Sequence, residues 1–288
     1  MVTQDKYCFE RDKKESESFL MQSRLDLQHR VLVKTSGDTL IHPSIPLNEI
    51  RSVADIATGT GIWLQDVSKF LDTAQIERYY HGFDISAEQF PENPGAIHFS
   101  VQDLTIPFPR EHWGRYDLVH VRLLVAALEE ADYKAAIANI YDILKPGGYL
   151  QWEEIDEETY LTEGYPVLSE LHRCFDYGLT AEGKCFQASA KVYEKSRAAG
   201  FVGVERLCYN SHLNPDLRYE IEDRLTALIR TLYAFLLLRS KQVDTALVAS
   251  QEAEKLVEQH RRLCAQGNSP PLKLMRVVGR KPLHSSLL

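Results

Sequence analysis

Residues 53–61 read Val53-Ala54-Asp55-Ile56-Ala57-Thr58-Gly59-Thr60-Gly61, and this stretch decides the fold. The apolar run that ends at Ala57 predicts a buried strand, and the two glycines predict a tight turn into a helix over Gly61–Leu71. Glycine lets the backbone turn sharply and approach a ligand, while the N-terminus of a helix offers free N–H groups. The stretch is therefore typical of the strand–turn–helix units that bind ligands in α/β proteins.

Strand and helix patterns alternate on both sides of this turn. Short apolar runs predict strands, and amphipathic runs predict helices at 131–144 and 186–199. The predicted strands are Ile50–Ala57, Tyr79–Asp84, Ala96–Val101, Tyr116–Val121, Tyr149–Glu153, Val202–Tyr209 and Leu272–Val278. Because strands that alternate with helices form parallel sheets covered on both faces, the pattern predicts an α/β fold.

Three segments lie outside this alternation. Residues 1–48 predict a polar tail followed by a helix, which we expect to form an N-terminal helical cap or lid. Residues 157–185 and 213–270 are mostly helical and too long for plain connections, so we expect them to cover one end of the sheet. The chain of 288 residues is thus predicted to hold one decorated α/β domain over 49–288 behind the cap.

Composition argues against several partners. The chain has 41 acidic and 33 basic residues, a net charge of −8, which disfavours binding to nucleic acids or to anionic membranes. The five cysteines include no Cys-x-x-Cys pair, so no metal site is predicted. The N-terminus lacks the apolar core of a signal peptide, and the apolar run Leu232–Leu238 is far shorter than the roughly 20 residues of a membrane span. We expect a cytoplasmic protein.

Carboxylates follow the second and third predicted strands. Asp84 lies 23 residues after Gly61, where it can accept both hydroxyls of a ribose, and Asp103 stands where it can accept from an adenine amino group. The dinucleotide fingerprint G-x-G-x-x-G would need a third glycine where the chain has Leu64, and no P-loop follows the turn. Since ligands of open α/β sheets bind at these strand ends, the pattern favours a nucleoside ligand without a pyrophosphate.

Five motifs in order resemble those of class I S-adenosylmethionine-dependent methyltransferases. The resemblance covers about residues 20–156. Two further stretches, Arg24-Leu-Asp-Leu-Gln-His29 and His42-Pro-Ser-Ile-Pro46, are similar to sequences of the fungal branch that modifies secondary metabolites. The five motifs are Asp55-x-Ala-Thr-Gly-Thr-Gly61, Gly82-Phe-Asp-Ile-Ser86, Gln102-Asp103-Leu104, Tyr116-Asp-Leu-Val-His-Val-Arg122 and Leu144-Lys-Pro-Gly-Gly-Tyr-Leu-Gln-Trp-Glu-Glu154.

The resemblance implies a Rossmann-like seven-stranded sheet, mostly parallel with an antiparallel last strand. It also implies that S-adenosylmethionine is the cofactor, with its methionine part at Asp55 and the glycine turn, its ribose at Asp84 and its adenine at Asp103. The chain departs from the family pattern at Ala57, where a glycine is usual. The residues expected to bind the cofactor are Arg24, Asp55, Ala57, Gly59, Gly61, Asp84, Ile85, Gln102, Asp103, Leu104, His120 and Arg122.

Two residues are candidates for catalysis. His120, at the end of the fourth strand, has an unperturbed pKa near 6.5 that suits a general base, although a packed histidine is an equal alternative. Glu153 ends the fifth strand and is the fallback base, for which it needs a raised pKa. Either Glu153 or Glu154 is expected to face the acceptor or the sulfonium, and Arg122 or Arg24 to hold the cofactor carboxylate.

These observations together predict methyl transfer to an oxygen, sulfur or nitrogen atom of a small-molecule acceptor. Two alternatives stay open. One is a methyltransferase-like regulator of secondary metabolism that acts through protein partners, and the other is a nicotinamide-dependent oxidoreductase. Leu64 and the Asp103 motif argue against the oxidoreductase, and the retained cofactor residues argue against the regulator.

Overall fold

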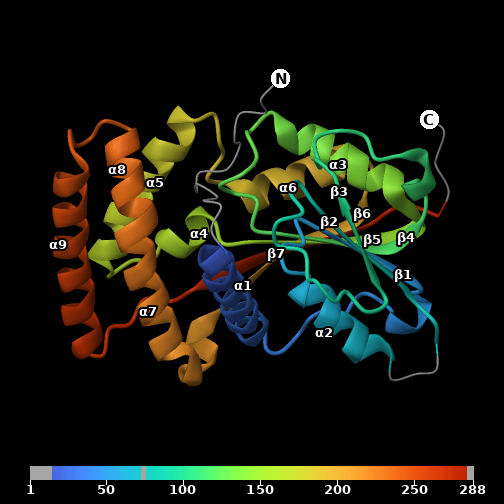
Figure 1. Ribbon diagram of the computed structural model, residues 1–288, viewed down its shortest axis with the longest axis horizontal. Coiled ribbons are helices and arrows are strands. Elements are labelled where there is room, and N and C mark those ends of the chain that lie inside the picture. Colours follow the sequence, from blue (N-terminus) through green and yellow to red (C-terminus); the bar gives the residue numbers. More distant parts are fainter. Residues whose placement is uncertain (1–14, 73–75, 284–288) are drawn as a thin grey trace.

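The computed structural model describes residues 15–72 and 76–283, with the backbone alone for 15–23. Over these residues seven strands form one sheet in the order β3-β2-β1-β4-β5-β7-β6 (Figure 1). Strands β1 to β5 pair in parallel, and β7 runs antiparallel to both of its neighbours. The strands are β1 Ser52–Ile56, β2 Tyr79–Asp84, β3 Ile97–Val101, β4 Tyr116–Arg122, β5 Leu144–Glu154, β6 Val202–Asn210 and β7 Lys273–Arg280. The predicted sheet and its antiparallel last strand are confirmed.

Helices cover both faces of this sheet. Helix α2 (Ile62–Leu71) packs on one face with Trp63, Leu64 and Val67 buried against β1, β2 and β4. Helices α3 (Asp132–Ile143) and α6 (Ala188–Ala198) pack on the other face, as Figure 1 shows. The strand order reverses between β1 and β4, so their carboxyl ends form the switch point where open α/β sheets bind ligands.

A second group of helices lies beyond the carboxyl ends of the parallel strands, at the left of Figure 1. Its members share an apolar cluster of their own, which includes Phe175, Ile229 and Leu236. They are α4 Glu157–Tyr160, α5 Pro166–Ala181, α7 Arg218–Leu228, a π-helical turn Ile229–Tyr233, α8 Ala234–Arg239 and α9 Ala246–Ala265. We call this group the helical lobe. Its helices fall within the two segments that the sequence predicts to cover one end of the sheet.

Helix α1 (Glu15–Thr35) lies between the helical lobe and the sheet (Figure 1). It contacts α2 and β7, and the segment after it crosses to the sheet through His42 and Ile45. This helix belongs to the predicted cap over 1–48, of which residues 1–14 lie outside the described residues.

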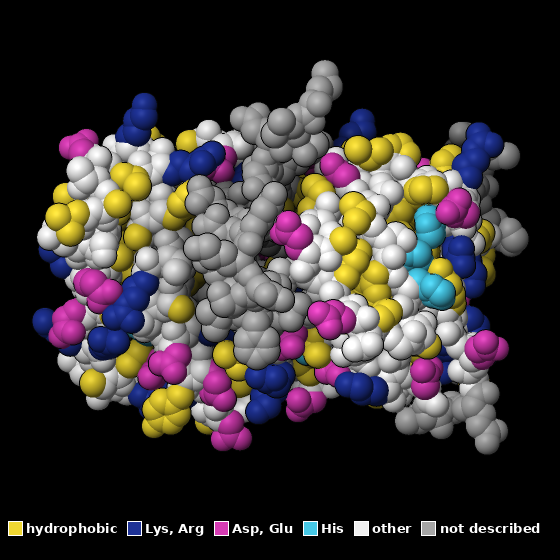
Figure 2. Space-filling view, viewed as in Figure 1, with side chains coloured by type: hydrophobic (Ala, Val, Ile, Leu, Met, Phe, Trp, Pro, Cys, Tyr) yellow, Lys and Arg dark blue, Asp and Glu magenta, His cyan; other side chains and the backbone are white. Residues whose placement is uncertain are grey.

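Neither a membrane span nor a metal cluster is found in the described part. No helix there is both long and apolar enough to cross a bilayer. No group of three His, Cys, Asp or Glu side chains with metal-binding geometry occurs in the same ranges. The face shown in Figure 2 carries interspersed acidic and basic side chains over the helical lobe, and histidine side chains reach the surface on the sheet side.

Candidate active site

The turn between β1 and α2 has left-handed backbone at three positions. Ala57, Gly59 and Gly61 have φ angles of +57°, +55° and +72°. At Gly61 a Cβ atom would lie 2.6 Å from Cζ of Phe99, so packing as well as conformation requires glycine. Ala57 adopts the conformation that glycine would adopt there, at an expected cost of about 1–2 kcal/mol. The turn thus accommodates alanine in the left-handed conformation that a glycine would adopt there.

Asp55 fixes this turn from the end of β1. Its Oδ2 accepts a 2.7 Å hydrogen bond from Thr58 Oγ1, and its Oδ1 lies 2.7 Å from Nδ1 of His120. The second contact is possible because β1 and β4 are neighbours and Asp55 is paired with His120 in the register. Both oxygens of this buried carboxylate thus bind the protein itself, so Asp55 holds the turn and orients an imidazole ring.

Asp84 closes the turn from the end of β2. Its Oδ2 accepts a 2.9 Å hydrogen bond from the backbone N–H of Gly59, and its Oδ1 accepts one of 3.3 Å from Ser86. A carboxylate has about four acceptor sites, so these contacts are compatible with the hydroxyls of a ribose. The next residue, Ile85, is 49% exposed and places an apolar side chain beside the carboxylate.

The Gln102-Asp103-Leu104 motif forms a turn after β3. Oδ1 of Asp103 accepts from the backbone N–H and the hydroxyl of Thr105 at 2.8 and 2.7 Å. The Gln102 amide donates to the carbonyls of Asp103 and Ile106, while the Leu104 side chain is buried in the core. The side chains of Gln102 and Leu104 thus serve the turn and the core, so their backbone groups are what they offer a ligand.

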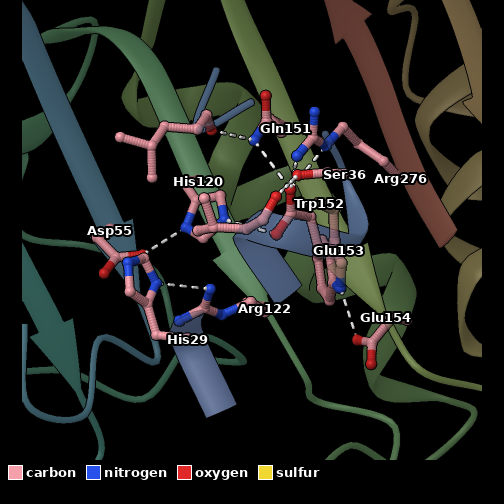
Figure 3. Close-up of polar contacts among 12 residues, drawn as sticks. His29, Ser36, Asp55, His120, Arg122, Gln151, Trp152, Glu153, Glu154 and Arg276 are labelled. Atoms are coloured by element: carbon pink, nitrogen blue, oxygen red, sulfur yellow. Dashed lines mark hydrogen bonds and ion pairs between the residues drawn. The ribbon is translucent and has the colours of Figure 1, made fainter. Parts of the chain in front are cut away.

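His120 lies buried between two carboxylates, as Figure 3 shows. Its ring stacks on Trp63, with 3.7 Å between ring centroids and 7° between planes. Nδ1 faces Asp55, and Nε2 lies 3.6 Å from Oε2 of Glu153, with no hydrogen-bond partner of its own. Donation from Nδ1 to Asp55 selects the tautomer whose lone pair is on Nε2. The ring is 1% exposed, which makes it part of the interior.

Glu153 is held ionised by its neighbours. Burial raises the pKa of this carboxyl group, but the charges of Arg276, His120 and Arg122 outweigh burial and keep the pKa below its ordinary value. Nε of Arg276 donates to Oε1 of Glu153 at 2.6 Å, and the Gln151 amide donates to the same oxygen at 3.2 Å. The fallback base role predicted for Glu153 needed a raised pKa, so the structure gives the opposite direction and that prediction is wrong.

Glu154 points to the other side of β5. Its carboxylate accepts hydrogen bonds from the backbone N–H groups of Leu124 and Val125 at 2.9 and 3.2 Å and from the Trp152 indole at 2.7 Å. Burial, followed by the charge of Asp156, raises the pKa of Glu154 to about 8, although these hydrogen bonds oppose the rise. Glu154 therefore clamps the loop that follows β4.

Comparison with known proteins assigns this constellation to a family. A family model described as a methyltransferase domain matches residues 27–202, more than half of the chain. The chain belongs to this methyltransferase family. The matched range contains the glycine turn, Asp84, Asp103, His120 and Glu153.

Three relatives illustrate the branch. Methyltransferase grgD of Penicillium sp is 42% identical over 144 residues, 48% of this chain and 50% of the relative. N-methyltransferase gliN of Aspergillus fumigatus is 33% identical over 154 residues, 51% of this chain and 53% of the relative. Secondary metabolism regulator LAE1 of Hypocrea atroviridis is 28% identical over 219 residues, 73% of this chain and 59% of the relative. The chain thus spans about half the length of the first two, and the resemblance to fungal methyltransferases is confirmed.

Arg122 of this methyltransferase domain contacts α1. Its Nη1 lies 3.2 Å from Nδ1 of His29, whose Nε2 lies 3.0 Å from Oδ2 of Asp66. Burial, with a smaller contribution from Arg122, lowers the pKa of His29 to about 4, so the ring is neutral at pH 7. A neutral ring that donates to Asp66 accepts from Arg122, and this chain of contacts joins β4 to α1 and α2. Arg122 therefore lies at the carboxyl end of β4, as predicted.

Arg24 lies elsewhere on α1. It is exposed, and its charge acts on Arg224 of α7, on the side of α1 away from the glycine turn. The residue of α1 that reaches the turn is Asp26, whose Oδ1 accepts a 2.9 Å hydrogen bond from Thr60 Oγ1. A contact between Arg24 and the cofactor carboxylate therefore stays a prediction.

Several residues of the site were not among the predicted site residues. They are His29, Trp63, Gln151 and Arg276, and each is buried and in contact with a predicted residue or its partner. His29 and Gln151 lie inside quoted motifs, and Arg276 had a signal of its own, because it is a lone charge inside the apolar strand Lys273–Arg280. A charged residue at such a position needs a buried partner, and the partner is Glu153.

Proposed function

We propose that this chain transfers a methyl group from S-adenosylmethionine to an oxygen, sulfur or nitrogen atom of a small-molecule acceptor, with S-adenosylhomocysteine as the second product. The observation that carries the proposal is the hydrogen bond that links the ends of β1 and β2. The left-handed turn after β1 and the carboxylate of Asp84 after β2 are tied together by the Gly59–Asp84 hydrogen bond of 2.9 Å. The backbone N–H groups of the turn suit the carboxylate of the cofactor's amino-acid part, and the carboxylate of Asp84 suits the hydroxyls of its ribose.

The residues present fit the cofactor. Asp84 offers acceptors for ribose hydroxyls, and Ile85 offers an exposed apolar surface for a base. The turn through Gly59 offers backbone N–H groups for a carboxylate, and Asp103 lies on the adjoining strand end. When bound, the cofactor supplies an electrophilic methyl group on a positively charged sulfur.

The chain's own contribution is mainly to position and enclose the reactants. Such a displacement needs an aligned nucleophile and the exclusion of water, and alignment alone supplies much of the rate. Helix α1 lies on the turn, where Leu25 Cδ1 would be 3.4 Å from a Cβ at Gly59 and Asp26 binds Thr60. We assign residues 1–48, 157–185 and 213–270 to the cap and lid that select the acceptor.

His120 is proposed as the base for acceptors that are hydroxyls. Donation from Nδ1 to Asp55 leaves the lone pair on Nε2, which is the atom that would take the proton from the acceptor. A thiol acceptor ionises more readily, so for such an acceptor the base contributes less.

A second candidate is a regulator that acts through protein partners. The similarity to the regulator LAE1 over 73% of this chain supports it. A regulator needs no turnover, whereas an enzyme must convert the cofactor. Membership of a methyltransferase family favours methyl transfer over hydride transfer by a nicotinamide.

Mass spectrometry of the purified protein tests the proposal, together with calorimetric titration by S-adenosylhomocysteine. We expect the nucleoside to copurify and to bind saturably at one site per chain. Absence of saturable binding would overturn both the cofactor assignment and the enzyme proposal. Binding without methylation of any acceptor in a small-molecule extract would favour the regulator.

A further inference from the structure

The segment that leads from α1 to the sheet is held by a buried side chain of β5. We call residues 39–42 of this segment the strap. Oε1 of Gln151 accepts a 2.8 Å hydrogen bond from the backbone N–H of His42, and Nε2 of Gln151 donates to the carbonyl of Leu40 at 3.0 Å. These two strap groups flank Ile41, so the amide replaces the backbone partner that an adjacent strand would provide.

The orientation of this amide is fixed by Glu153. Nε2 of Gln151 also donates to Oε1 of Glu153 at 3.2 Å, and the same oxygen accepts from Nε of Arg276 at 2.6 Å (Figure 3). A rotated amide would place its oxygen against this carboxylate and its NH₂ group against the N–H of His42. Nη2 of Arg276 in turn donates to the carbonyl of Thr39 at 2.8 Å. The strap is therefore bound to the side chains that hold the carboxylate beside the proposed base.

The strap limits where α1 can lie. Residues 36–38 alone join the helix to the strap, and so short a connection keeps the end of the helix close to it. Further along the helix, Oδ1 of Asp26 accepts from Oγ1 of Thr60 at 2.9 Å, and Nε2 of His29 lies 3.0 Å from Oδ2 of Asp66. Both contacts are partly exposed to solvent, whereas the strap is held by buried side chains. Because buried groups are costly to leave unpaired, the strap is a firm attachment for the cap.

We infer that Gln151 is a positioning residue, which holds the strap so that α1 stays on the glycine turn and retains the bound cofactor. The inference rests on the proposed function, because the cofactor is what the cap retains. The NH₂ group of Gln151 is used within the protein, so the residue acts through the strap and not by donating to the cofactor. Without the amide, the N–H of His42 and the carbonyl of Leu40 have lost their partner in the interior, which favours a displaced strap.

Release of S-adenosylhomocysteine from the full chain tests the inference. The dissociation rate is measured by chasing radiolabelled S-adenosylhomocysteine with an excess of the unlabelled compound. Gln151→Met keeps most of the volume and removes the hydrogen bonds, so we expect release to become about tenfold faster, the equivalent of roughly one hydrogen bond. Ser52→Ala is the matched control, because it removes the 2.7 Å bond from a buried hydroxyl to the carbonyl of Arg115 at the amino end of the same sheet. This control should lose stability and keep the parental rate.

Gln151→Glu adds a readout that a general loss of stability does not move. When ionised, the introduced carboxylate turns an oxygen towards the carbonyl of Leu40 and the carboxylate of Glu153, whereas the protonated form restores a donor there and still accepts from His42. Burial and the charge of Glu153 raise the pKa of the introduced group, and Arg276, which is already paired with Glu153, opposes this only in part. Relative to the parent at the same pH, we expect fast release at pH 8 and recovery to within about twofold at pH 5.5.

The possible outcomes separate the inference from the proposed function. Parental release from Gln151→Met, an equal acceleration in Ser52→Ala, or a rate in Gln151→Glu that does not recover at the lower pH would overturn the inference alone. If Gln151→Met does not fold, the pH series of Gln151→Glu decides. If the parent itself does not bind S-adenosylhomocysteine, the proposed function fails and the inference fails with it.

Discussion

Replacement of Arg276 by Met tests how much of the active-site edge depends on one buried ion pair. The side chains of Arg276 and Glu153 are 1% and 4% exposed, and their closest atoms lie 2.6 Å apart. Removing one partner of a buried pair leaves the other charge without compensation, which typically costs 3–5 kcal/mol. Methionine keeps most of the volume, and the lost 2.8 Å hydrogen bond from Nη2 to the Thr39 carbonyl adds to the cost. We expect the free energy of unfolding to fall by about 4 kcal/mol at pH 7.5.

The effect should depend on pH with a defined sign. In the parent the pKa of Glu153 is below its ordinary value, so its contribution to stability is present above that ordinary pKa and is lost as the pH falls further. Without Arg276 the largest charge that lowers the pKa of Glu153 is lost, so burial raises this pKa above its value in the parent. The ionised carboxylate then destabilises the variant at high pH, and the difference from the parent should shrink as the pH falls towards 5.

Urea unfolding at pH 7.5 and pH 5.0 measures both effects. Arg206→Met is the control, because the Arg206–Glu158 pair spans 2.8 Å but is 25% and 34% exposed, and such pairs contribute at most about 1 kcal/mol. Adding Glu153→Gln to Arg276→Met should restore part of the loss. The reasoning is refuted if Arg276→Met costs no more than Arg206→Met, or if its cost is the same at both pH values.

Three further outcomes are expected. Asp84→Ala should weaken S-adenosylhomocysteine binding by about 2–4 kcal/mol in calorimetry, since two charge-assisted hydrogen bonds are lost, while the exposed Asp216→Ala should bind as the parent does. His120→Ala should lower kcat on a hydroxyl acceptor by about 10²–10⁴-fold with cofactor binding nearly unchanged, and parental turnover would reject the base role. His81→Phe should flatten the loss of stability on acidification. Burial, followed by the charges of His112, His98 and Arg115, lowers the pKa of His81 to about 3. Between that pH and about 6.5 the unfolded state therefore binds one more proton than the folded state. The free energy of unfolding then falls by up to about 1.4 kcal/mol for each pH unit of acidification. An unchanged slope between pH 6 and pH 4 would contradict this.

Most of the fold could be predicted because its signals are local. The stretch from Val53 to Gly61 contains a buried strand, a turn and a helix start, and each is decided by neighbouring residues. The resemblance implied seven strands with an antiparallel last one, but the order of the strands was not predicted, because periodicity indicates which segments are strands and not which strands are neighbours. The antiparallel pairing of β7 with β5 depends on contacts between residues more than a hundred positions apart, such as Glu154 and Met275.

The site could be predicted only where its residues lie in motifs. Asp55, Asp84 and Asp103 end successive strands and were found from that placement. The bond from Arg276 to the Thr39 carbonyl joins residues 237 positions apart, and the bond from Arg122 to His29 joins residues 93 apart. No local pattern encodes such a pair, since either residue alone is compatible with a solvated surface.

The two adjacent glutamates at the end of β5 show why position alone does not assign a role. Successive residues of a strand point to opposite faces, so Glu153 meets Arg276 and His120 while Glu154 meets the backbone of the loop after β4. Cationic neighbours lower the pKa of Glu153, and burial without a cation raises that of Glu154 to about 8. Neither is suited to take a proton from an acceptor, because the first is too weak a base and the second is occupied by three donors. The ionised Glu153 instead compensates the buried charge of Arg276 and flanks the imidazole ring of His120, with its Oε2 3.6 Å from Nε2.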